Sequence, residues 1–333
     1  MRKLRTIDVF TIPLFFVGPA AAILRTIALL TSFDEATMHF DNKTAIVISG
    51  IIIAVSIAAF MSYFVLGEKE CELIARNDNA ASYIPAGIVS TTLLFMGANI
   101  FYQNSLIGTT YYSTTRIIGL VAGLLAILSV ASFFLSIFIE KRNNMFKAAF
   151  SLSIVAFLAV YAMLLYFNKE IHPTNSPNRL VDQLAYLLSA IFFLFEARIP
   201  LGREKWRGYV AFGLSAALMC AYSSIPALIM YFVRGYVVSE SLIESILTLT
   251  LMIFIGSKVL QIKNLTPDAE CEEAKSIVAL ASMRADEIEA QRTISHAQED
   301  IIEENDDTED ASNYSFDIPM PEAQTEFNVE DLR

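Results

Sequence analysis

The stretch LVDQLAYLLSAIFFLFEARIPLGREKW, residues 180–206, decides the class of fold. Its apolar run is long enough to cross the ~30 Å hydrocarbon core of a bilayer as a helix. The stretch carries Glu196 and Arg198 near its end and closes with a basic cluster before Trp206. It therefore predicts a transmembrane helix with ionisable groups inside the membrane and a positively charged flank.

Apolar runs of this length recur along the chain, which has 333 residues, is 55% hydrophobic and has a mean hydropathy of +0.50. We expect eight spans, at residues 9–31, 44–66, 84–103, 117–139, 147–167, 181–201, 209–232 and 241–261. The fold class predicted for residues 1–263 is an all-α polytopic integral membrane helix bundle.

The basic residues give this bundle an orientation. With the N-terminus inside, the cytoplasmic flanks collect 13 Lys and Arg residues and the outer loops collect five. By the positive-inside rule, both termini are cytoplasmic. The N-terminus resembles a secretory signal, but its apolar run continues to Leu30, which favours a retained first span. We expect a multi-pass protein of the cytoplasmic membrane.

The composition changes after Lys263. Residues 264–333 carry 20 acidic and four basic side chains, whereas residues 1–263 carry 15 acidic and 20 basic. We expect a cytoplasmic acidic amphipathic helix at residues 264–303 and a largely disordered acidic tail at residues 304–333. Either this region is only a solvated tail, or it binds a cytoplasmic protein partner. A nucleic-acid partner is not expected.

Ionisable side chains inside a membrane should each have a partner or a purpose, and the candidates in the predicted spans are Arg25, Glu196 and Glu244. Depths estimated from the helical rise place Arg25 near the level of Glu244, and Glu196 near the level of Lys258. We therefore predict the intramembrane ion pairs Arg25–Glu244 and Glu196–Lys258. The alternative for the second pair is that Glu196 pairs locally with an arginine of its own stretch or extends to water.

Uncharged polar residues form a second candidate site. Thr92, Asn99 and Gln103 share one face of the predicted third span, and Tyr222 and Ser223 lie in the seventh. Such groups either join helices by hydrogen bonds or line a cavity for a neutral or zwitterionic ligand. Both interpretations stay open.

Prolines lie well inside two of the predicted spans, away from the span ends. Pro13 and Pro19 lie in the first and Pro226 lies in the seventh. Each removes a backbone donor and tends to kink the helix. We interpret them as the ordinary prolines of membrane helices.

The motifs of known catalytic chemistry are not found. The three histidines and three cysteines are scattered, without metal-ligand spacing, and the sequence has no GxSxG, P-loop or dinucleotide-binding motif. We accordingly assign no catalytic residue, no metal site and no cofactor. An enzyme, acting on lipid for example, is the least favoured class of function.

Two passages, LRTIALLTSFD at residues 24–34 and LFEARIPLGREKW at residues 194–206, resemble uncharacterised multi-spanning membrane proteins of clostridial-type Gram-positive bacteria. The resemblance covers the membrane block and implies a bacterial inner-membrane location, without an activity. The function expected from the sequence is a non-enzymatic sensor or scaffold that couples a membrane-embedded polar cavity to a cytoplasmic partner through the acidic tail. The alternative is a transporter of a small polar or amphipathic molecule that uses Glu196 or Glu244 as its coupling group.

Overall fold

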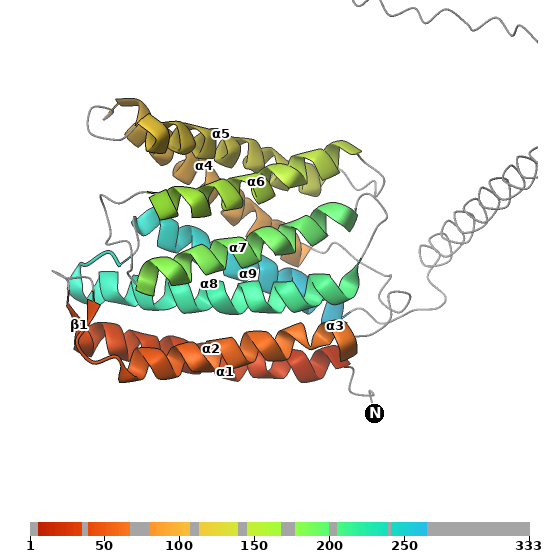
Figure 1. Ribbon diagram of the computed structural model, residues 1–333. Helices are drawn as coiled ribbons and strands as arrows, with labels where there is room; N and C mark the ends of the chain where they lie inside the picture. Colours follow the sequence, from red (N-terminus) through yellow and green to blue (C-terminus); the bar gives the residue numbers. More distant parts are fainter. Residues whose placement is uncertain are drawn as a thin grey trace, which may run out of the picture. The chain divides into compact units, whose positions relative to one another are not determined.

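The computed structural model describes residues 6–34, 39–66, 80–106, 113–138, 145–167, 177–199, 205–238 and 241–264. In chain order these residues form α1 (Thr6–Ser32), β1 (Phe33–Asp34), β2 (His39–Phe40), α2 (Thr44–Met61), α3 (Tyr63–Leu66), α4 (Ala80–Leu106), α5 (Ser113–Phe138), α6 (Met145–Phe167), α7 (Pro177–Arg198), α8 (Trp206–Arg234) and α9 (Leu242–Asn264) (Figure 1). All of them belong to the compact unit Met1–Cys271. Apart from Asn264, the predicted cytoplasmic helix and the acidic tail lie outside the described residues.

Eight segments of the described chain are long and apolar enough to span a membrane. They are Val9–Ser32, Thr44–Leu66, Tyr83–Asn104, Thr115–Phe133, Ala148–Phe167, Pro177–Arg198, Trp206–Arg234 and Leu242–Gln261. The second span contains both α2 and α3, which are separated by a turn at Ser62. The all-α polytopic membrane bundle predicted from the sequence is thereby confirmed.

Six of the helices are neighbours in a closed order. Each helix from α4 to α9 packs against the next one in the chain, and α9 packs back against α4. Inside this ring, the Phe133, Phe193 and Phe254 rings of α5, α7 and α9 meet with centroids 5.2 to 5.9 Å apart. Side chains therefore fill the ring of helices at this level.

The first two helices form a layer of their own. Helices α1 and α2 pack against each other and against α8 (Figure 1). This contact makes α8 the helix shared by the α1–α2 layer and the six-helix ring. Most side chains of α8 are accordingly buried on every face, as in a helix at the centre of a large core.

A short hairpin follows the end of α1. Strands β1 and β2 pair antiparallel, with Phe33 opposite Phe40, and Phe33 also packs against Tyr236 just after α8. The ends of α1 and α8 therefore lie together, and α9 begins close to the same point. We call this the hairpin end of the bundle.

The outward faces of the helices are strongly apolar. Phe16, Val65 and Phe232 are each more than 70% exposed, and many other large aliphatic side chains are exposed as well. A water-soluble monomer rarely presents so much apolar surface. In this bundle the exposed side chains are the ones that contact the acyl chains of the bilayer.

Candidate functional site

Among the described residues, a group of buried polar side chains lies between α1, α2, α7 and α8. We call it the polar cluster and define it by Arg25, Ser49, Asn178, Asp182, Tyr222 and Ser223. Every one of these side chains is at most 5% exposed. Burying polar and charged groups so deeply inside a membrane protein costs free energy unless they are hydrogen-bonded. Each of these side chains is therefore expected to have a partner.

Arg25 reaches two other helices from α1. One terminal nitrogen, Nη1, donates a hydrogen bond to the backbone oxygen of Tyr222 on α8, and Nη2 donates to Asn178 Oδ1 on α7 at 2.9 Å. The guanidinium also lies over the Tyr222 ring, with its central carbon 4.8 Å from the ring centroid, as in a cation–π contact. A single side chain thus joins three helices about 10 Å from the end of α1.

The acidic member of the cluster is Asp182. Its Oδ1 accepts a hydrogen bond from Ser223 Oγ on α8, and its carboxylate acts electrostatically on Arg25. The positive and negative charges are therefore held in one buried network.

Ser49 connects α2 to the same place. Its hydroxyl lies 2.7 Å from the Tyr222 hydroxyl and also donates to Ile46 O in its own helix. Tyr222 consequently contacts α1 through its backbone oxygen and its ring, and α2 through its hydroxyl. It is the residue at which the polar contacts of the α1–α2 layer converge.

The polar region continues from the cluster towards α9. Tyr186 on α7 lies within the electrostatic influence of Glu244, Asp182 and Cys220. Its hydroxyl is buried and has no hydrogen-bond partner in the described part of the chain. Ser189 on α7 and Cys220 Sγ on α8 lie 3.3 Å apart. Two carboxylates, Asp182 and Glu244, thus act electrostatically on a buried tyrosine hydroxyl.

The residue spacing of α7 explains why one helix supplies so many of these groups. Asn178, Asp182, Tyr186 and Ser189 follow one another at intervals of four, four and three residues, so they occupy one face of the helix. All four side chains are buried. The spacing of this polar stripe is visible in the sequence, but Asn178 lies before the predicted span and Asp182 is only its second residue, so neither stands out as an intramembrane group.

The predicted ion-pair residues lie inside the bundle. Arg25, Glu244 and Lys258 are 1%, 1% and 6% exposed, and Glu196 is half-buried. Both described hydrogen bonds of Arg25 go to uncharged acceptors. The pairing of Arg25 with Glu244, and that of Glu196 with Lys258 across the contacting helices α7 and α9, stay predictions.

The two halves of the predicted polar cavity lie on different helices with different neighbours. Tyr222 and Ser223 belong to the polar cluster. Thr92, Asn99 and Gln103 lie on α4, which packs against α5 and α9. Thr92 contacts Thr250 Oγ1 of α9 at 3.1 Å, and Gln103 Nε2 lies 3.5 Å from Asn99 Oδ1 within α4. The α4 residues therefore form interhelical and local contacts of their own.

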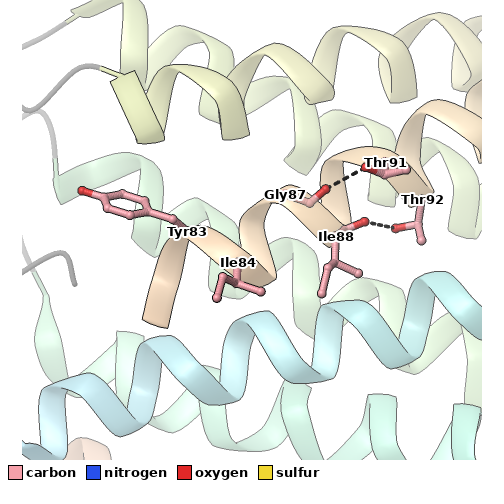
Figure 2. A pocket seen from close by; sticks show the side chains of 6 residues that line it. All are labelled: Tyr83, Ile84, Gly87, Ile88, Thr91 and Thr92. Atoms are coloured by element: carbon pink, nitrogen blue, oxygen red, sulfur yellow. Dashed lines mark hydrogen bonds between the residues drawn. The ribbon is translucent and has the colours of Figure 1, made fainter. Parts of the chain in front are cut away.

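A hollow of about 360 Å³ lies along α4, and Thr92 is one of its lining residues. Figure 2 shows its lining residues, Tyr83, Ile84, Gly87, Ile88, Thr91 and Thr92, along one stretch of the helix. The Thr91 and Thr92 hydroxyls donate to the backbone oxygens of Gly87 and Ile88, one turn back. Because these hydroxyls are used within the helix and Ile84 and Ile88 are exposed, the hollow presents a mainly apolar surface.

The described residues hold no group of three or more His, Cys, Asp or Glu side chains arranged to bind a metal ion. The polar cluster holds charged groups inside the bundle and joins helices through hydrogen bonds. Comparisons of the chain with protein-family models, curated proteins and solved structures found no match.

Proposed function

We propose that this integral membrane protein is a non-enzymatic sensor or scaffold whose polar cluster responds to a signal and whose residues 264–333 bind a cytoplasmic partner. One observation carries the proposal, namely that Arg25, Asn178 and Tyr222 join three helices through a buried charged side chain. Ionisable groups inside a membrane are costly and usually mark function. A change at a site shared by several helices also shifts all of them together.

The expected orientation supports this assignment. The excess of Lys and Arg on the predicted inner flanks predicts that both termini are cytoplasmic, in which case the hairpin end faces outside. The polar cluster would lie in the outer half of the membrane and the acidic region inside the cell. We propose the cytoplasmic membrane of a Gram-positive bacterium as its location.

The experiment is a comparison of proteins that copurify with the full chain, with a chain lacking residues 264–333, and with Asp182→Asn in the full chain. A sensor or scaffold loses its cytoplasmic partner with the deletion, and Asp182→Asn changes the amount of partner bound. Ser215→Ala serves as the control, since this buried hydroxyl of α8 bonds within its own helix. Identical copurifying proteins with and without residues 264–333 would contradict the assignment.

A second candidate function is coupled transport of a small polar or amphipathic molecule. It is favoured by the two buried carboxylates, Asp182 and Glu244, that act on the Tyr186 hydroxyl. Glu244 or Glu196 would be the coupling group, and Asp182 joins them as a candidate. Proton uptake into pyranine-loaded proteoliposomes, on addition of a mixture of amino acids and small amines, tests this function. Coupled transport is lost in Glu244→Gln and retained without residues 264–333, which is the reverse of the result for a scaffold.

A further inference from the structure

Helix α8 contains a proline at a position where a helix normally donates a hydrogen bond. The backbone N–H of residue 226 would donate to the oxygen of Tyr222, four residues earlier, but Pro226 has no N–H. A proline inside a membrane helix is tolerated when another group satisfies the oxygen that has lost its donor. Tyr222 is 3% exposed, so bulk water does not readily fill this role.

The group that reaches this oxygen is Arg25 Nη1, from a different helix. We propose that Arg25 replaces the hydrogen-bond donor that Pro226 lacks, and that this contact is a latch that fastens the α1–α2 layer to α8. The fork of the guanidinium suits this role because its second terminal nitrogen bonds Asn178 on α7 at the same time. The sequence alone suggested no more than an ordinary kink at Pro226.

The contact between Arg25 and Tyr222 matters because of the way in which the α1–α2 layer packs on the rest of the bundle. Outside their own pair, α1 and α2 pack mainly on α8, and the Ser49 hydroxyl of α2 reaches the same Tyr222. In lipid, apolar packing gains little over contact with acyl chains, so helices are held by close packing and interhelical hydrogen bonds. Withdrawal of the guanidinium leaves the Tyr222 oxygen without this donor and loosens α1 and α2 from the ring.

The latch acts on the same residues as the proposed function but does not require that function. A sensor and a transporter would each need the α1–α2 layer to be fastened at this point. The test of the latch measures the apparent melting temperature, whereas the test of function measures partner binding. Either proposal can therefore be contradicted without the other.

The test is a double-mutant cycle on full-length protein purified in detergent, with the apparent melting temperature as the readout. Arg25→Met alone is expected to lower that temperature by on the order of 5 °C. In the Pro226→Ala background, residue 226 regains its N–H and satisfies the Tyr222 oxygen within α8. Arg25→Met is then expected to lower the melting temperature by less, because only the loss at the Tyr222 oxygen is compensated, while the Asn178 contact is lost in both backgrounds. Pro226→Leu restores the same N–H and serves as a second variant.

Arg116→Met is the matched control. Arg116 Nε also donates to a backbone oxygen of another helix, that of Asn104 near the end of α4, at 2.9 Å. No proline is involved there, so Arg116→Met should lower the melting temperature equally with Pro226 and with Pro226→Ala. An equal fall in melting temperature on Arg25→Met with and without Pro226 would overturn the latch. If Arg25→Met does not accumulate, recovery of accumulation by Pro226→Ala or Pro226→Leu supports the latch, and failure of both to restore it overturns it.

Discussion

At the scale of single residues, arginine recurs as a donor to the backbone of another helix. Besides Arg25, this role is taken by Arg116, which donates to Asn104 O, Arg207, which donates to Phe64 O, and Arg234, which donates to Leu30 O. Three of these oxygens lie in the last turns of their helices, where carbonyl groups have no partner within the helix. Arginine suits the task because its donors are several and its stem is long. The Tyr222 oxygen is the exception, since it lies inside a helix.

The hydrogen bond between Ser223 and Asp182 gives a prediction at this scale. Ser223→Ala removes a donor to a buried carboxylate, and we expect a loss of stability of about 1.5–3 kcal/mol. Ser215→Ala is the control because that buried hydroxyl donates to Ala211 O in its own helix, and its loss should cost less than ~0.5 kcal/mol. Unfolding in mixed detergent measures both free energies, and equal losses for the two variants would contradict a role for Ser223 in the cluster.

The sequence predicted some residues of the site and missed others for a physical reason. Arg25, Tyr222 and Ser223 stood out because polar groups are rare inside apolar runs. Asp182 and Asn178 were missed because they lie at the start of α7, where a charge is normally assigned to the membrane surface. Helical periodicity shows which residues share a face of one helix, but it does not show which helix that face meets. For this reason the sequence could not show that the α4 and α8 residues of the predicted cavity contact different helices.

At the scale of helices, the spans could be predicted accurately from the sequence because the apolar runs are long. All eight predicted spans overlap the observed ones, and the second span has the same limits, Thr44–Leu66. Helix ends differ more, since a helix continues into polar residues beyond the membrane. Helix α7, for example, begins at Pro177, a residue well suited to the first turn, rather than at residue 181. The break at Ser62 was not predicted, since the apolar run continues on both sides of this serine.

Glycine packing gives a prediction for the contact between α8 and α9. A Cβ added at Gly213 would lie 2.5 Å from Val259 Cγ2 and 3.1 Å from the Phe192 ring. Gly213→Ala is therefore expected to push the helices apart and destabilise the protein by about 1–3 kcal/mol. At Gly256 on α9 an added Cβ meets nothing within 4 Å, so Gly256→Ala should instead stabilise by about 0.5–1 kcal/mol. Melting temperatures of the two variants measure the effects, and a shift of the same sign in both would contradict the packing described.

At the scale of the whole molecule, the order of helices in space was beyond the sequence. The closed order from α4 to α9, with the α1–α2 layer on α8, depends on which buried faces fit each other. Helix α8 is rich in small residues up to Ala227, which suits a helix that packs closely against several others. The orientation of the bundle and the role of the acidic region stay predictions from charge.

The central claim is that the hairpin end of the bundle, with its polar cluster, faces outside while residues 264–333 are cytoplasmic. A single measurement tests it, namely labelling of intact cells with a membrane-impermeant maleimide. Cys71 and Cys271 lie in segments expected to be cytoplasmic, so the natural chain should stay unlabelled until the cells are permeabilised. Asn175→Cys, in the segment just before α7, should be labelled at once from outside. Labelling of Cys271 in intact cells, with protection of a cysteine at position 175, would contradict the claim.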